Sequence, residues 1–295
     1  MTKLVSIRRS AIVALCALAF AVPPAAGSAA EASPPARIVS LGGAVTEILY
    51  RLGAGDRVAA VDTTSIHPPE ALGTRPNVGY LRQLSAEGIL SVRPDLVLAV
   101  DGAGPPDVLQ QVREAGVPIE AVPEAPTPAG IVGKIAVIAR VVGREKEGAA
   151  LMEEVERGFA VLAADRARIT RPVRALFVLS LQNGRVMVGG RGTTADGMFA
   201  LAGAENVAAA VKGYKPMSDE AILAAQPEVV VMMETGPGAV PAAEVLGGAA
   251  LAGTPAGRNG RLVKMNGLYL LGFGPRTPAA ARELMTSLMP PMRPE

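Results

Sequence analysis

A segment of thirteen residues occurs twice in this chain, and the second copy lies 133 positions after the first. The copy that begins at Ser85 reads SAEGILSVRPDLV, and the copy that begins at Ser218 reads SDEAILAAQPEVV. Each has a serine that can cap a helix, an acidic residue in the first turn, a short apolar helix, a proline and then a strand. The strands, 96–100 and 229–233, are continuous apolar runs, which suit parallel strands that are covered on both faces.

A second pair of segments supports the same repeat. Residues 46–58 and 196–207 both read as a helix that ends at a glycine and is followed by a strand. Further strands are expected at 37–40 and 174–179, so each half reads strand–helix–strand–helix–strand. The sequence therefore predicts an α/β fold with two parallel-sheet lobes, an N-terminal lobe over 37–143 and a C-terminal lobe over 171–295.

Residues 144–170, between the two halves, carry no strand signal. Their apolar residues have helical spacing, and Pro172 ends the pattern; they are Leu151, Met152, Val155, Phe159 and Leu162. A helix of about 25 residues is roughly 37 Å long, enough to connect the two lobes. We expect one long backbone helix, with a ligand cleft between the lobes at the carboxyl ends of their strands.

The first thirty residues have the pattern of a cleavable export signal. Basic residues come first, an apolar run covers 11–22, and small residues around 28–32 offer a cleavage site. The run is too short to span a bilayer, which needs roughly 20 residues. The one cysteine, Cys16, lies in this run and follows Leu15 rather than a small residue, so no lipid anchor is expected. The mature chain would be free of cysteine and located in the periplasm.

Composition argues for a carrier rather than an enzyme or a nucleic-acid binder. The formal net charge is +2, and it becomes −1 when Lys3, Arg8 and Arg9 leave with the signal peptide. His67 is the only histidine, so neither a metal site with paired imidazoles nor a catalytic triad can be assembled. The two Gly-Gly pairs, at 42–43 and 189–190, are more typical of tight strand-to-helix turns than of a phosphate loop.

Five segments resemble haem (hemin) ABC-transporter substrate-binding proteins, a group within the class that also binds cobalamin and ferric siderophores. The resemblance covers about 37–289, and its segments are IVSLGGAVTEI at 38–48, VGYLR at 78–82, LSAEGIL at 84–90, RPDLVL at 93–98 and LYLLGFGPR at 268–276. It implies a monomer that hands ferric haem to an inner-membrane ABC permease dimer, with an outer-membrane haem receptor system as an indirect partner.

The resemblance also implies a set of ligand contacts. Tyr80 matches the axial ligand of the haem iron, which suits a hard ferric ion. A tyrosine in water has a pKa near ~10, so iron and a cation such as Arg82 must favour the phenolate. Tyr214 is a candidate second contact from the other lobe. Candidates for the haem propionates are Arg185, Arg191 and Arg276.

Each of these residues also has a plainer reading. The two tyrosines can be packing or rim residues, and Arg82 can be a solvated loop residue. Some relatives supply a second-lobe histidine where this chain reads GTTAD at 192–196, so five-coordinate iron is the simplest expectation. Relatives often have an arginine where this chain reads Glu234-Thr235-Gly236. His67, which precedes two prolines, is a weaker candidate ligand.

Glu87 and Glu220 occupy equivalent positions of the repeat, each two residues after its serine. The resemblance implies that they dock onto arginines of the two permease subunits. The alternative is that each only stabilises the N-terminus of its helix.

Other functions stay open at this point. The runner-up is a carrier of cobalamin or a ferric siderophore, although the lack of tryptophan and the 3% of aromatic residues count against a corrin ligand. A periplasmic haem-handling enzyme would need a distal acid–base residue, and a receptor-coupled sensor would need no transport.

Overall fold

The computed structural model describes residues 34–182, 185–234 and 241–289. The expected signal peptide, 1–30, and its Cys16 lie outside the described residues. Among the described helices, none combines the length and the apolar character needed to cross a membrane.

The first lobe is built on a sheet that, within the described residues, has four parallel strands in the order β2-β1-β3-β4. These are β1 (Ile38–Leu41), β2 (Val58–Val61), β3 (Leu96–Val100) and β4 (Ile119–Val122). All residues of β1 and β3 are buried, as their apolar runs predict. The helices are α1 (Gly43–Arg51), α2 (Pro69–Thr74), α3 (Ala86–Ser91), α4 (Pro106–Glu114) and α5 (Pro128–Val141), with a 3₁₀ turn, η1 (Gly55–Arg57).

The second lobe has a sheet of six strands, counted over the described residues, in the order β10-β9-β5-β6-β8, with β7 beside β5. They are β5 (Arg174–Gln182), β6 (Arg185–Gly189), β7 (Glu205–Asn206), β8 (Tyr214–Met217), β9 (Val229–Glu234) and β10 (Leu262–Asn266). Two α/β lobes are therefore confirmed. The prediction of an all-parallel second sheet is corrected, because β6 runs antiparallel to both β5 and β8.

The helices of the second lobe surround this sheet. They are α7 (Thr194–Ala202), α8 (Asp219–Ala225), α9 (Ala242–Gly247), α10 (Ala249–Ala252), α11 (Pro255–Arg258), α12 (Gly267–Leu271) and α13 (Thr277–Leu288). The helix α7 ends at Gly203 and the helix α1 is followed by Gly53, and both glycines have positive φ. These are the helix ends that the second pair of repeated segments predicts.

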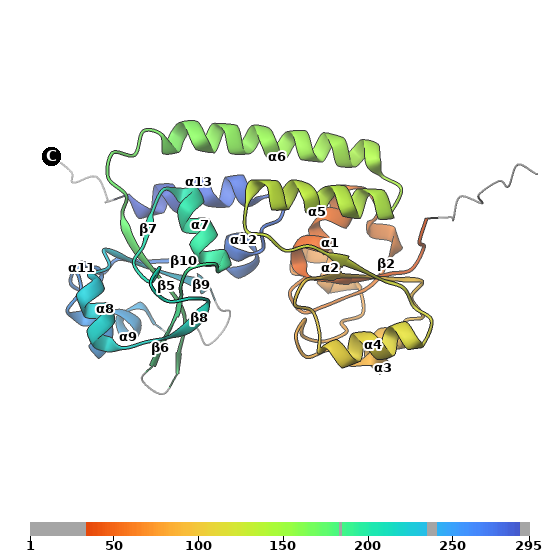
Figure 1. Ribbon diagram of the computed structural model, residues 1–295, viewed down its shortest axis with the longest axis horizontal. Coiled ribbons are helices and arrows are strands. Elements are labelled where there is room, and N and C mark those ends of the chain that lie inside the picture. The colour runs from red at the N-terminus through yellow and green to blue at the C-terminus, as the bar shows by residue number, and fades with distance from the viewer. Residues whose placement is uncertain (1–33, 183–184, 235–240, 290–295) are drawn as a thin grey trace, which may run out of the picture. The chain divides into compact units, whose positions relative to one another are not determined.

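The connecting helix is α6 (Glu145–Arg166), 22 residues and therefore ~33 Å long. It is slightly shorter than the predicted 144–170. It packs against α5 of the first lobe and against α7 and α13 of the second (Figure 1). Its buried residues Leu151, Val155 and Leu162 belong to one hydrophobic core that includes residues of both lobes, such as Leu49 and Leu284. The core that stabilises the fold therefore continues from lobe to lobe along α6.

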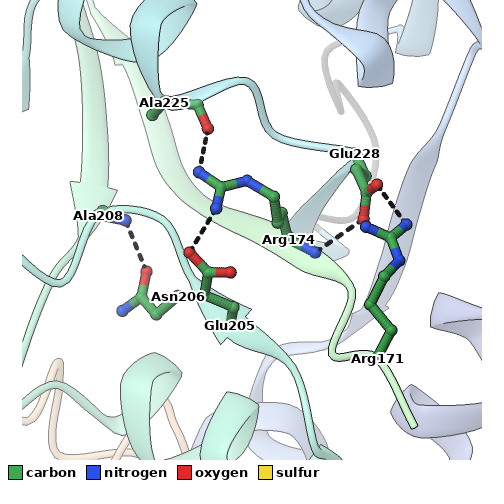
Figure 2. Close-up of polar contacts among 7 residues, drawn as sticks. All are labelled: Arg171, Arg174, Glu205, Asn206, Ala208, Ala225 and Glu228. Carbon is green, nitrogen blue, oxygen red and sulfur yellow. Dashed lines mark hydrogen bonds and ion pairs between the residues drawn. The ribbon is translucent and has the colours of Figure 1, made fainter. Parts of the chain in front are cut away.

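Polar contacts at the beginning of β5 fix the second lobe's repeat unit (Figure 2). Arg174 donates from Nη1 to Glu205 Oε1 at 2.6 Å and from Nη2 to the carbonyl oxygen of Ala225 at 2.8 Å. Its backbone N–H donates to Glu228 Oε2 at 3.1 Å, and Arg171 holds the other oxygen of Glu228 at 2.6 Å. The first strand is thus tied to the C-terminal end of α8 and to the residue that precedes β9.

The first lobe repeats this arrangement at the beginning of β1. Arg37 donates from Nη2 to the carbonyl oxygen of Val92 at 2.6 Å, and its backbone N–H donates to both carboxylate oxygens of Asp95, at 3.0 and 3.1 Å. Val92 and Asp95 lie 133 positions before Ala225 and Glu228, the displacement of the sequence repeat. The repeat seen in the sequence is therefore also a repeat of polar contacts.

Candidate ligand-binding site

The loop that carries Tyr80 extends the first sheet beyond the carboxyl end of β2. The N–H of Val78 donates to the carbonyl oxygen of Val61 at 2.9 Å, and the N–H of Thr63 donates to that of Gly79 at 3.0 Å. Gly79 has φ +103°, a conformation that favours glycine. Tyr80 therefore lies at the sheet edge where ligands of α/β folds bind.

A buried carboxylate organises the neighbouring loop. Asp62 is fully buried, and its Oδ1 accepts hydrogen bonds from the N–H of Gly42 at 2.8 Å and from Ser65 Oγ at 2.9 Å. Its Oδ2 accepts from the N–H and the hydroxyl of Thr64, at 2.9 and 2.6 Å. Asp62 was not singled out from the sequence, although an aspartate directly after a buried strand and before Thr-Thr-Ser is a recognisable turn signal.

Tyr80 and Arg82 are both exposed, with 46% of Tyr80 accessible to solvent. Neither side chain makes a hydrogen bond or an ion pair with any residue that the structure describes. Their backbone is nevertheless fixed, because the N–H of Gln83 donates to the carbonyl oxygen of Tyr80 at 2.7 Å and the N–H of Gly104 donates to that of Leu81 at 3.0 Å. A phenol and a guanidinium are thus presented together on an anchored loop.

Tyr214 begins β8, opposite Gly189 of β6. Its ring meets the ring of Phe177 edge to face at 6.3 Å, and its hydroxyl lies 2.9 Å from Thr194 Oγ1. A Cβ on Gly189 would lie 2.9 Å from Phe177 and 3.3 Å from Tyr214, so the glycine makes room for both rings. Tyr214 is 38% exposed, while its hydroxyl already has a partner.

Two of the candidate arginines lie at opposite ends of β6. Arg191 pairs through its backbone with Lys212, and the N–H of Gly213 donates to its carbonyl oxygen at 3.0 Å, so its main chain lies beside that of Tyr214. Arg185 begins β6, four residues and therefore ~13 Å before Gly189. Both side chains are exposed and unpaired with the described residues.

Arg276 differs from the other arginines because it is already in a salt bridge. Its Nε and Nη2 donate to Oε1 and Oε2 of Glu47, both at 3.0 Å, and Glu47 is 2% exposed. The Tyr269 ring lies 5.1 Å from the guanidinium carbon. Burial of Tyr269, followed by the charge and hydrogen bond of Glu283, raises the pKa of this phenol. A haem propionate would therefore have to compete with the carboxylate of Glu47 for the guanidinium of Arg276.

The remaining candidate metal ligands are dispersed. His67 is half-buried on the loop between β2 and α2. In the segment 192–196, Thr193 caps α7 by accepting from the N–H of Asp196 at 3.1 Å. Over the ranges that the structure describes, no three His, Cys, Asp or Glu side chains are grouped so that they could hold a metal ion. The segment 235–236 lies outside those ranges.

The predicted serine caps are confirmed in both copies of the repeat. Ser85 Oγ accepts from the N–H of Gly88 at 3.0 Å, and Ser218 Oγ accepts from that of Ala221 at 3.3 Å. Glu87 and Glu220 are both exposed beside these caps. Hydrogen bonds from its own backbone N–H and from the Ser218 hydroxyl lower the pKa of Glu220. Both glutamates are therefore accessible, and Glu220 also contributes to capping.

The family model described as "Periplasmic binding protein" matches residues 38–267. Among solved structures, the periplasmic heme-binding protein RhuT from Roseiflexus sp. RS-1 in apo form is 40% identical, with a TM-score of 0.82, and the match covers 85% of this chain and 97% of that one. The periplasmic heme-binding protein BhuT in complex with two hemes is 39% identical, with the same TM-score and the same coverage.

Two curated relatives are less similar in sequence. The uncharacterized ABC transporter substrate-binding lipoprotein YvrC of Bacillus subtilis is 28% identical over 67% of this chain, and the match spans 63% of that protein's length. The vitamin B12-binding protein of Vibrio parahaemolyticus is 29% identical over 67% of this chain and 70% of its own length.

Proposed function

Because the chain belongs to the periplasmic binding protein family, we propose that it binds haem in the periplasm and delivers it to an inner-membrane ABC importer. Two heme-binding proteins in the family are 40% and 39% identical over 85% of this chain, whereas the vitamin B12-binding relative is 29% identical over 67% of it. The greater similarity to heme-binding proteins favours haem as the ligand.

The observation that carries this proposal is the presence of Tyr80 and Arg82, two positions apart, on one anchored loop. Both are exposed, and neither side chain has a partner among the described residues. A phenolate oxygen is a known protein ligand of haem iron, and a nearby cation favours the phenolate over the phenol. The loop therefore offers an iron ligand together with the charge that activates it.

The second lobe would contribute the remaining contacts. The exposed ring of Tyr214 offers an apolar face to the porphyrin, while its hydroxyl stays with Thr194. Arg191, whose main chain lies beside that of Tyr214, has no acidic partner among the described residues and is one propionate candidate. Arg185 lies opposite Gln182, at the carboxyl end of β5, and is a second propionate candidate, whereas Arg276 is held by Glu47.

Cobalamin is the second candidate ligand, because a vitamin B12-binding protein is among the relatives. Parallel titrations of the purified protein with ferric haem, cobalamin and a ferric siderophore separate the candidates. Haem as the cargo predicts saturable one-to-one binding of ferric haem with a tyrosinate-type visible spectrum, and no saturation by the other two. Saturable binding of cobalamin or of the siderophore, without haem binding, would overturn the proposal.

Delivery to the importer would use Glu87 and Glu220. The repeat puts one exposed glutamate on each lobe, each in the first turn of its helix. A permease with two related subunits needs one anchor per subunit, and two equivalent acids at a displacement of 133 meet that need. Capping accounts for an acid at each position but does not require that both be glutamate.

A further inference from the structure

The segment 267–276 of the second lobe contacts the first lobe through two ionic groups. Three of the residues involved belong to the first lobe and three to the second, and together we call them the interlobe joint: Glu47, Glu124, Lys134, Tyr269, Phe273 and Arg276. The joint is separate from α6, so it forms a second tie between the lobes.

The first ionic group is the pair of Arg276 and Glu47. Its two parallel N–H···O contacts of 3.0 Å make a bidentate arrangement, which fixes direction as well as distance. The side chain of Glu47 is 3% exposed and that of Arg276 is 29% exposed, so little water competes for the contact. The Tyr269 ring, 5.1 Å from the guanidinium carbon, adds a cation–π contact.

The second group is centred on Lys134 of α5, whose side chain is fully buried. Its Nζ donates to Glu124 Oε2 at 2.9 Å and to the carbonyl oxygen of Phe273 at 3.2 Å. Phe273 is itself fully buried, and its φ of 46° lies in the left-handed region. Lysine is almost never fully buried unless it is paired, so Lys134 depends on both contacts. Its contact with the carbonyl oxygen of Phe273 holds the backbone of segment 267–276 against α5 of the first lobe.

Small residues let the two lobes meet closely at the joint. A Cβ on Gly43 of α1 would lie 2.6 Å from Leu268 Cδ1 of α12. A Cβ on Gly274 would lie 3.3 Å from Glu47 Oε2 and 3.4 Å from the Cβ of Ala44. Because of these close contacts, segment 267–276 cannot shift along α1 without a steric clash.

We propose that Glu47, Arg276 and Lys134 are positioning residues, which hold the lobes in one relative orientation whether or not ligand is bound. One connecting helix fixes the spacing of two lobes but resists rotation about its own axis less well, and a second tie removes that freedom. The expected effect on haem affinity rests on the proposed function, whereas the contacts of the joint do not depend on it. Arg276 then acts through Glu47 and not as a propionate partner.

Spin-label distance measurements on the full chain test the joint directly. Cys16→Ala removes the one native cysteine, and Arg113→Cys and Glu244→Cys supply one exposed label site in each lobe. The parent should give a single narrow distance distribution that haem leaves unchanged. Glu47→Gln and Arg276→Lys should each broaden the distribution without ligand and raise the haem Kd about tenfold.

Controls separate this role from others. Arg51→Gln breaks an exposed contact with Glu154, made from the same helix α1, and should broaden nothing. Circular dichroism and melting establish that each variant is folded, and Arg276→Lys keeps the positive charge if Glu47→Gln does not fold. Narrow distance distributions in the folded joint variants would overturn the inference. So would weaker haem binding in Arg276→Lys together with unchanged binding in a folded Glu47→Gln, because Arg276 would then contact the ligand itself. If the parent bound no haem, the proposed function would fail while the distances still tested the joint.

Discussion

The hydroxyl of Tyr214 lies 2.9 Å from Thr194 Oγ1, while the ring of the same residue meets Phe177 edge to face. The hydroxyl is therefore occupied within the second lobe, and the 38% of Tyr214 that is exposed is what remains for a ligand. This division predicts that the ring, rather than the oxygen, contacts haem.

Tyr214→Phe and Tyr214→Ala separate the two parts of that side chain. We expect Tyr214→Phe to keep the iron spectrum and a haem affinity close to that of the parent, because the aromatic face is retained. Tyr214→Ala removes that face and should raise the haem Kd, by about 5–10-fold, since an aromatic contact contributes about 0.5–1.5 kcal/mol beyond its buried area. An altered iron spectrum in Tyr214→Phe would instead identify the hydroxyl as an iron ligand.

Arg82 should support the phenolate form of the iron-bound tyrosine. In Arg82→Ala the nearby positive charge is lost, so on acidification the tyrosinate band should disappear at a higher pH than in the parent. Arg82→Lys keeps the charge and should largely restore the parent's profile. The apo-protein should melt at nearly the same temperature, because Arg82 is exposed and makes no ion pair with the described residues. A lower melting temperature with an unchanged pH profile would mean that Arg82 has a structural role only.

The double variant Glu87→Ala, Glu220→Ala should separate binding from transport. Both side chains are exposed, so the haem titration should be nearly unchanged, while haem uptake through a reconstituted permease should fall sharply. The matched control is Glu70→Ala with Glu244→Ala, which removes one first-turn acid from α2 and one from α9. Normal uptake by the Glu87, Glu220 variant would leave helix capping as their only role.

Glu228 should make the stability of the fold depend on pH. Burial acts to raise its pKa, but the hydrogen bonds from Arg171 and Arg174 and their charges outweigh burial and lower it. Because the folded pKa is the lower one, this contribution is present above the unfolded pKa of about 4.3 and is lost as pH falls through the folded pKa.

Glu228→Gln should therefore cost about 1–3 kcal/mol of unfolding free energy at pH 7, where the carboxylate would be charged. Urea unfolding at a series of pH values measures this cost. The gap between parent and variant should shrink as the pH falls below about 4. A gap that stays constant down to about pH 3 would show that the carboxylate charge contributes nothing.

The parts of the fold that depend on local residue spacing, such as the repeated helix caps, could be predicted from the sequence. The caps at Ser85 and Ser218 depend on residues three positions apart, so local spacing reveals them. The dipeptide Asn183-Gly184 is a strong hairpin signal in the sequence, and it is the one local feature that indicates the antiparallel pairing of β5 with β6. The apolar run 174–179 is typical of a buried parallel strand. The strand-to-helix turn expected at 189–190 places a strand before it but does not indicate that this strand, β6, runs antiparallel.

The contacts of the candidate site were harder to predict. The pairing of Arg276 with Glu47 joins residues 229 positions apart, and nothing local in one sequence indicates such a contact. Arg276 was therefore assigned to a propionate by resemblance alone. Tyr80 and Arg82 were found by their shared motif, but their exposure and lack of partners among the described residues required the structure.

The visible spectrum of ferric haem bound to the parent and to Tyr80→Phe tests the central claim most directly. Tyr50→Phe is the matched control, because Tyr50 is a half-buried tyrosine of α1 that packs on the core. The parent and Tyr50→Phe should both show the tyrosinate band, whereas Tyr80→Phe should lose it and still retain weaker haem binding through the porphyrin's apolar faces. An unchanged spectrum and affinity in Tyr80→Phe would contradict the assignment of Tyr80 as the iron ligand.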